Sequence, residues 1–328
     1  MDRFCKANAA QAEYIERAVK AADTIGIVGH VRPDGDDVGS CLGLARYIGS
    51  VNPKADVRVF LEEFPDNFMF LAGADQVIHD FDTDFVPQLC FMLDCADEKR
   101  MGGAAKYFLT AGERICIDHH ATNDGSIDAH MIVEPKRSST CELLCTLIDM
   151  NGLDQAAAEC LYLGIVHDTG VFKHSNTGFE TMLYAGKLIE LGARPHFVID
   201  YTFYKKTYPQ NRALGQVLLN SSLMADGRII VSSFTNEEMR QYGVKPSDLD
   251  GCIDQLRVTE GVEAAAFIYQ MPDGAFKVSL RSNGTVDVSR VAQLFGGGGH
   301  VKASGCEMEG TPEEIAQILC AEIVKQIR

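Results

Sequence analysis

The sequence predicts an α/β protein with a parallel sheet in its first half and a smaller α+β domain in its second half. Apolar runs alternate with amphipathic helical stretches up to about residue 192, which is typical of a parallel sheet covered on both faces. Each apolar run ends in a polar cluster containing Asp or His. The 328 residues also suffice for two domains of roughly 100–200 residues each.

The elements of the first half are assigned in chain order. A helix at about 8–22 precedes an apolar strand at 24–30, a turn, and a helix from about Val38 to Ser50. Further strands are predicted at 57–61, 89–94 and 114–118, and further helices at 138–152, 154–168 and 179–191. Because Gly192 ends the last helix, we place the first domain at 1–192.

The second half has a different pattern. Residues 193–212 are aromatic and basic without a clear period and are interpreted as a helical connector. Strands are predicted at 215–224, 228–234, 262–271 and 275–282, and helices at 235–241, 287–295 and 312–327. These elements define a second, smaller α+β domain at 213–328, which contains a run of four glycines at 296–299.

The charge of the chain limits its partners. Thirty Lys and Arg against 46 Asp and Glu give a net charge of −16, so the overall field repels phosphate. Proteins that hold long nucleic acids by neutralising the backbone usually have the opposite charge. The sequence therefore predicts no long nucleic acid partner and requires any phosphate binding to be local.

Hydropathy and cysteine usage predict the compartment. The chain has no run of the roughly 18 apolar residues that a membrane helix needs, and its first 22 residues lack the apolar core of a secretory signal. Eleven cysteines without zinc-ribbon spacing indicate free thiols in a reducing environment. We expect a cytoplasmic protein with no membrane partner, and a homodimer is compatible with the sequence.

The strongest chemical signal is the placement of acidic and imidazole side chains after successive apolar elements. They are His30, Asp34 and Asp36 after the first strand, Asp94 after a second, Asp118, His119 and His120 after a third, and Asp168 after an apolar helix. Ligands of open parallel sheets bind at the carboxyl ends of the strands, so these clusters are expected to converge there.

Carboxylates and imidazoles without thiolates suit Mn²⁺, Mg²⁺ or Fe²⁺, and six or more such ligands indicate two ions. Gly35 permits a tight turn, so Asp34 and Asp36 can point at different ions. A central carboxylate such as Asp94 would bridge ions about 3.5–4 Å apart, as in two-metal phosphoester hydrolysis. Taken singly, Asp-Gly-Asp is usually a turn and Asp168 a helix cap, but their joint occurrence favours a metal centre.

The same segments resemble a known family. GHVRPDGDDVGS, LDCAD, DHH and GIVHDTG, in that order, resemble the four motifs of the DHH phosphoesterase superfamily. The segment LRSNGTVDVSRVAQLFGGGGHVKASG at 280–305 is similar to the signature of the type-one DHH-associated C-terminal domain. Within the superfamily, the chain most resembles the stand-alone oligoribonuclease/pAp phosphatase (nano-RNase) group. The resemblance implies an active site in the cleft between the two domains.

The resemblance also implies roles for individual residues. One metal would be held by His30, Asp34 and Asp94, and the second by Asp36, Asp94, His119 and Asp168. Asp118 and His120 would support these ligands or contact phosphate, so that Asp94, Asp118, His119 and His120 form the catalytic set. The ions implied are two Mn²⁺. They would activate a water, so no Ser or Cys nucleophile is needed.

Substrate-binding residues are predicted mainly in the second domain. They are Arg281, Gly297, Gly298, Gly299, His300 and Lys302, together with Arg32 of the first domain. The glycine run is not a Walker loop, yet consecutive glycines let backbone amides approach a phosphate, whereas the alternative is a flexible loop. Arg32 either contacts substrate phosphate or pairs with Asp37, and His167 is either a buried or cleft-edge histidine or a substrate contact.

These observations predict a two-metal phosphoesterase that hydrolyses short oligoribonucleotides, dinucleotides and 3′-phosphoadenosine 5′-phosphate (pAp) to mononucleotides. A phosphodiesterase for cyclic or linear dinucleotides is an alternative with the same architecture. A catalytically silent nucleotide-binding regulator is an alternative of another class, against which the intact set of ligands argues.

Overall fold

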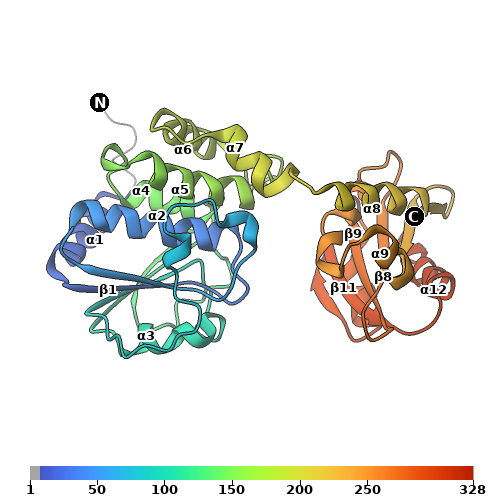
Figure 1. Ribbon diagram of the computed structural model, residues 1–328, viewed down its shortest axis with the longest axis horizontal. Coiled ribbons are helices and arrows are strands. Elements are labelled where there is room, and N and C mark those ends of the chain that lie inside the picture. The colour runs from blue at the N-terminus through green and yellow to red at the C-terminus, as the bar shows by residue number, and fades with distance from the viewer. Residues whose placement is uncertain (1–7, 328) are drawn as a thin grey trace. The chain divides into compact units, whose positions relative to one another are not determined.

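The computed structural model describes residues 8–327. The chain forms two compact units that divide between Lys205 and Lys206, and each unit is built around its own sheet (Figure 1). This division lies within the connector predicted at 193–212. The α/β class, with a parallel sheet first and a mixed sheet second, is confirmed.

The first unit contains a five-stranded, entirely parallel sheet in the order β2-β1-β3-β4-β5. The strands are β1 (Thr24–Val28), β2 (Asp56–Phe60), β3 (Leu89–Leu93), β4 (Glu113–Asp118) and β5 (His130–Val133). The chain runs outward from β1 to β2 and then returns to β3 on the other side of β1. The strand order therefore reverses between β1 and β3, which is where ligands bind in open parallel sheets.

Helices cover both faces of this sheet (Figure 1). On one face lie α1 (Ala9–Ala21), α2 (Gly35–Val51) and α4 (Thr140–Leu147), and on the other lies α3 (Ala105–Thr110). In β3, Phe91 joins the core of the first face, whereas Cys90 and Met92 join that of the second. This double burial explains why the strands appear as continuous apolar runs in the sequence.

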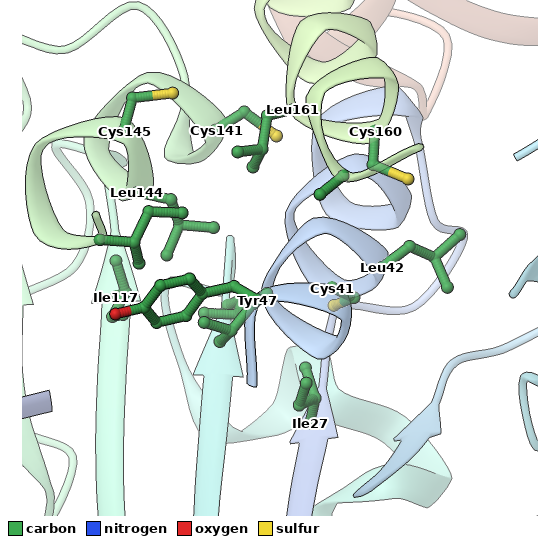
Figure 2. Close-up of a cluster of buried hydrophobic side chains, with 14 of the residues drawn as sticks. Ile27, Cys41, Leu42, Tyr47, Ile117, Cys141, Leu144, Cys145, Cys160 and Leu161 are labelled. Atoms are coloured by element: carbon green, nitrogen blue, oxygen red, sulfur yellow. The ribbon is translucent and has the colours of Figure 1, made fainter. Parts of the chain in front are cut away.

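Helix α5 (Gln155–Asp168) crosses α2 at glycines. A Cβ on Gly39 would lie 2.4 Å from the carbonyl oxygen of Cys160, and a Cβ on Gly164 would lie 2.2 Å from Sγ of Cys141. Figure 2 shows thiols and aliphatic side chains of α2, α4 and α5 packed beside this crossing. The two helices run in opposite directions, so the start of α2 meets the end of α5.

The first unit ends with α6 (Phe179–Glu190), α7 (Pro195–Ile199) and a π-helical turn at Asp200–Tyr204. The second unit begins with α8 (Tyr208–Leu219), so the connector consists of short helical pieces. No helix between residues 8 and 327 is both long enough and apolar enough to cross a membrane.

The second unit contains a six-stranded mixed sheet in the order β10-β11-β9-β8-β7-β6. Its strands are β6 (Ser222–Met224), β7 (Ile229–Phe234), β8 (Ala264–Gln270), β9 (Phe276–Ser282), β10 (Gly298–His300) and β11 (Ala303–Met308). Helices α8, α9 (Asn236–Tyr242) and α10 (Cys252–Arg257) pack on one face, and α11 (Val288–Gln293) and α12 (Pro312–Val324) pack on the other. Each face therefore has its own core.

The structure corrects two predictions for this unit. The strand predicted at 215–224 is wrong over 215–219, which end α8: Thr207 and Gln210 cap that helix, and Ala213 and Val217 bury its i, i+4 face. Gly298 and Gly299 of the glycine run are not a flexible loop, because they begin the edge strand β10, whereas Gly296 and Gly297 precede that strand. The sequence pattern did not predict β5, α3, α10 or β11, which the structure contains.

Candidate metal centre

The residues predicted as metal ligands lie together at the carboxyl edge of the first sheet. Three neighbouring strands, β1, β3 and β4, deliver His30, Asp94 and the Asp118–His120 cluster. Asp34 and Asp36 come from the start of α2, and Asp168 from the end of α5. The convergence follows from parallel strand direction and from the crossing of α2 and α5.

Asp94 is the central carboxylate. Its Oδ2 lies 3.6 Å from Nε2 of His30, and its Oδ1 lies 3.5 Å from Nε2 of His119. The side chain is 2% exposed, and the backbone adopts a positive φ of 53°. Such a backbone is strained for a non-glycine residue and occurs preferentially at functional sites. The two oxygens of Asp94 therefore face two different histidines.

The two carboxylates around Gly35 point in different directions. Asp34 caps α2, because its Oδ1 accepts the backbone N–H groups of Asp36 and Asp37 at 2.9 and 3.2 Å. Asp36 is fully buried and accepts the backbone N–H groups at the start of α4, from Thr140 at 2.6 Å and from the next residue at 2.9 Å. The start of α2 therefore holds the carboxylates of Asp34 and Asp36 in different directions.

His119 is surrounded by acidic groups. Its Nε2 lies 3.0 Å from Oδ2 of Asp168 and 3.9 Å from Oδ2 of Asp36, and its Nδ1 lies 3.3 Å from the carbonyl oxygen of Arg137. Although burial alone would lower the pKa of His119, the neighbouring carboxylates raise that pKa to about 10. Nε2 is nevertheless buried without a hydrogen bond of acceptable geometry. A buried nitrogen directed at carboxylates without a proper partner fits a metal ligand.

Four groups of side chains between residues 8 and 327 bring one ligand atom per residue within 4.8 Å of one another. They are His30, Asp34 and Asp94; Asp36, His119 and Asp168; Asp94, His119 and His120; and Asp34, His167 and Asp168. The first two correspond to the two predicted metal sites, and Asp94 lies between them. Imidazole and carboxylate donors of this kind suit a divalent cation.

Asp118 supports its neighbour. It is fully buried, accepts Nδ1–H of His120 at 2.8 Å and accepts the side-chain amide of Asn123 at 2.9 Å. Burial alone would raise the pKa of Asp118, but these hydrogen bonds keep that pKa below its usual value. Within residues 8–327 Asp118 belongs to none of the four groups. Its hydrogen bond to Nδ1 orients the ring of His120 beside Asp94.

Asp37, which extends the Asp-Gly-Asp segment, is also structural. It is fully buried, accepts the backbone N–H of His30 at 3.2 Å, and occupies the space above Gly29, where a Cβ would lie 1.8 Å from its Oδ1. In residues 8–327 no ion pair joins it to Arg32, whose backbone N–H donates to Glu62 at 2.9 Å. The structure thus shows Asp37 holding the backbone of His30, not pairing with Arg32.

Sequence reasoning missed Thr140. Its hydroxyl donates to Oδ1 of Asp94 at 2.9 Å. The sequence does contain a signal for the start of α4, because serine is a favoured N-cap residue. In the structure the side chain of Ser139 accepts the backbone N–H of Glu142. That signal predicts where α4 begins but not that the helix start meets the metal centre.

The predicted substrate-binding residues of the second unit lie on β9, β10 and the hairpin that joins β10 to β11. Arg281 of β9 is in register with Ala303, which is in register with His300 of β10. Residues in register share a face of the sheet, and in β9 this face carries the more exposed positions. Gly298 lies two residues before His300 in β10 and therefore on the same face of the sheet. Lys302 is exposed in the hairpin turn. Arg281 and His300 therefore lie on the same face of the sheet, on either side of the small side chain of Ala303.

An α/β domain with a carboxylate–imidazole centre at the carboxyl edge of its parallel sheet, followed by an α+β domain, defines the class of metal-dependent phosphoesterases. The model of the DHH family N-terminal domain matches residues 24–165, and that of the DHHA1 domain matches residues 226–327. The chain belongs to the DHH family, and it is a hydrolase of phosphoester bonds. The resemblance predicted from the sequence is confirmed.

Named relatives cover most of the chain. It is 29% identical over 317 residues to the bifunctional oligoribonuclease and PAP phosphatase NrnA of Thermus thermophilus, covering 95% of this chain and 93% of that one. It is 30% identical over 296 residues to the probable enzyme of the same name from Streptococcus mutans, covering 88% and 90%. The crystal structure of an exopolyphosphatase-related protein from Bacteroides fragilis aligns with a TM-score of 0.86 at 28% identity, covering 97% and 96%.

Proposed function

We propose that this protein uses two divalent cations, most suitably Mn²⁺, to hydrolyse short oligoribonucleotides and pAp to mononucleotides. The observation that carries the proposal is the position of Asp94, whose two oxygens face His30 and His119 separately. The names of the relatives, which are oligoribonucleases and PAP phosphatases, support this choice of substrates.

In the proposed centre the first cation is held by His30, Asp34 and Asp94, and the second by Asp36, Asp94, His119 and Asp168. When bound, the cations supply a nucleophile near neutral pH by lowering the pKa of water. This explains why the site needs no Ser or Cys nucleophile.

The residues around these ligands have their own proposed roles. The carbonyl of Arg137 orients the imidazole of His119 through Nδ1, and such contacts usually raise the affinity for metal. Asp118 fixes the ring of His120, whose side chain is 38% exposed and is therefore available to a phosphate oxygen. In this proposal Asp118 and His120 act beside the ligands.

The second unit is proposed to bind the rest of the nucleotide. Arg281 and His300 stand two strand spacings apart, about 10 Å, with Ala303 between them. This spacing leaves room for a phosphate between the guanidinium of Arg281 and the imidazole of His300. Gly298 has no atom within 4 Å of where its Cβ would lie, so the adjacent floor is open to a ribose or base. Gly297, Gly299, Lys302 and Arg32 complete the proposed substrate-binding set.

The charge of the chain favours small substrates. A net charge of −16 opposes binding of a long phosphate backbone, whereas metal ions and a few cationic side chains suffice for a short one. The cytoplasmic location proposed from the thiols and hydropathy agrees with such substrates.

A single assay panel with Mn²⁺ tests the proposal. The panel contains pAp, pGpG, a five-nucleotide RNA, a 24-nucleotide RNA and cyclic di-AMP. We expect hydrolysis of the first three and at least tenfold slower hydrolysis of the 24-nucleotide RNA. Comparable rates on the long RNA would contradict the preference for short substrates, and a clear preference for cyclic di-AMP would favour the dinucleotide phosphodiesterase.

The variant Asp94→Asn separates the enzyme from a silent regulator. It keeps the size of the side chain but weakens both metal sites, so we expect loss of hydrolysis on every substrate. Asp75→Asn changes an exposed carboxylate and serves as the matched control. If the wild-type protein binds pAp without hydrolysing any substrate, the regulator alternative is correct.

A further inference from the structure

The more exposed part of the metal centre carries a histidine that the two proposed sites do not use. His167 lies in the last turn of α5, against the start of α2. Its Nδ1 lies 4.0 Å from Oδ1 of Asp168. Its side chain is 31% exposed, whereas that of His30 is 5% exposed. His167 forms its own group of potential ligands with Asp34 and Asp168.

The position of the His167 ring is fixed by packing rather than by a hydrogen bond. A Cβ on Gly35 would lie 2.5 Å from Cγ of His167, so the ring sits directly against the backbone of α2. Phe68 and Phe203 contact the ring at centroid distances of 5.9 and 5.7 Å. The 4.0 Å separation from Asp168 is too long for a hydrogen bond. Packing therefore places the imidazole beside the carboxylates of Asp34 and Asp168.

We propose that Asp34, His167 and Asp168 form a third divalent-cation site, weaker than the other two. This inference rests on the proposed two-metal function. Asp34 belongs to the first proposed site and Asp168 to the second, so the third site shares one carboxylate with each. Its members are 21–43% exposed, whereas Asp36 and Asp94 are almost fully buried. The third site thus lies on the solvent-facing side of the centre.

The charge balance explains what a third cation would do. The four ligand carboxylates of the proposed centre carry four negative charges, which two divalent cations only neutralise. An approaching phosphate is itself an anion, so a third cation at the exposed side would provide net attraction where the substrate enters. We therefore expect phosphate and the third cation to bind cooperatively.

The test counts Mn²⁺ bound to the whole, metal-stripped protein by equilibrium dialysis, with and without inorganic phosphate. The wild-type protein should bind two equivalents tightly and a third at least tenfold more weakly, with phosphate strengthening the third. His167→Phe, which retains an aromatic ring between Phe68 and Phe203, should keep the two tight equivalents and lose the third. His196→Phe changes an exposed histidine of α7 and should behave as wild type.

Each other outcome is decisive. Two equivalents in the wild-type protein, even with phosphate, or an unchanged third equivalent in His167→Phe, overturns the third site while leaving the two-metal proposal intact. Fewer than two tight equivalents in the wild-type protein contradicts the proposed function itself. If His167→Phe unfolds at lower temperature than wild type, His167→Gln provides the second variant, and it should weaken the third equivalent at least tenfold. A raised KM for pAp with an unchanged metal count would make His167 a substrate contact and overturn the inference.

Discussion

Thr140 connects the two proposed metal sites through a pair of hydrogen bonds. Its hydroxyl donates to Oδ1 of Asp94 at 2.9 Å, and its backbone N–H donates to Oδ2 of Asp36 at 2.6 Å. All three residues are almost fully buried. The start of α4 therefore sets the orientation of a carboxylate that follows β3 and of another that begins α2.

Replacing Thr140 by Val should weaken Mn²⁺ binding by about 10–100-fold, because contacts that orient ligands have effects of this size. Valine keeps the shape of the side chain and the backbone N–H, so only the bond to Asp94 is lost. Isothermal titration calorimetry on the metal-stripped protein measures the affinity. Thr146→Val is the matched control on the same helix, since that hydroxyl donates to the carbonyl of Leu143. Equal affinities for the two variants would refute this role for Thr140.

Asp37 should contribute to stability rather than to metal binding. Burial raises the pKa of Asp37 above its usual value, and Asp37→Asn keeps an oxygen that can accept the backbone N–H of His30, so this variant should cost little. Asp37→Ala leaves the buried N–H of His30 without its partner and should lower the free energy of unfolding by about 1–3 kcal/mol. Urea unfolding of the two metal-free variants tests the difference. A larger loss for Asn than for Ala would contradict this interpretation.

The metal-free protein should lose stability as the pH rises. His30 and His119 have pKa values of about 10 in the folded protein, against 6.5 for an ordinary imidazole. Despite burial, which lowers the pKa of both, the surrounding carboxylates hold the protons. Between pH 6.5 and 10 the folded state therefore binds more protons than the unfolded state, so this contribution is complete below pH 6.5 and disappears as the pH passes 10.

Urea unfolding of the metal-free protein at pH 6, 7, 8 and 9 measures this loss. Mn²⁺ binding should show the opposite trend and strengthen from pH 6 to 8, because the imidazoles must release their protons to coordinate a metal. His196→Phe, which changes an exposed histidine of α7, should leave both trends unchanged. Metal-free stability that rises over this range would show that His30 and His119 are neutral in the folded protein.

The sequence predicts the parts of this molecule whose signals are local. Apolar runs ending in Asp or His placed His30 and Asp94 at strand ends, because buried parallel strands have few polar residues. The role of Thr140 could not be predicted, because its partner Asp94 lies 46 residues away in the sequence. Hydrophobic periodicity carries no information about such a long-range contact. The apolar residues at 217–219 fit a short strand and a helix equally well, and only burial of Val217 with Ala213 against the sheet decides for α8.

Gly297, which precedes β10, and Gly298, its first residue, should differ: the first is predicted to be structural and the second to face the substrate. A Cβ on Gly297 would lie 2.2 Å from the carbonyl oxygen of Gly305, whereas a Cβ on Gly298 would meet nothing within 4 Å. Gly297→Ala should therefore lower the free energy of unfolding by about 1–3 kcal/mol through overpacking. Gly298→Ala should leave stability unchanged, because its new methyl group would project from the open face that carries Arg281 and His300.

Gly298→Ala should instead raise KM for pAp several-fold, because the methyl group occupies the floor on which we propose that the nucleotide lies. Mn²⁺ affinity should stay at the wild-type value in both variants, since both glycines belong to the second unit and all proposed ligands to the first. Thermal unfolding, steady-state kinetics and metal titration on the two variants distinguish these effects. An unchanged KM in Gly298→Ala, with the protein fully folded, would show that substrate does not contact this face of β10.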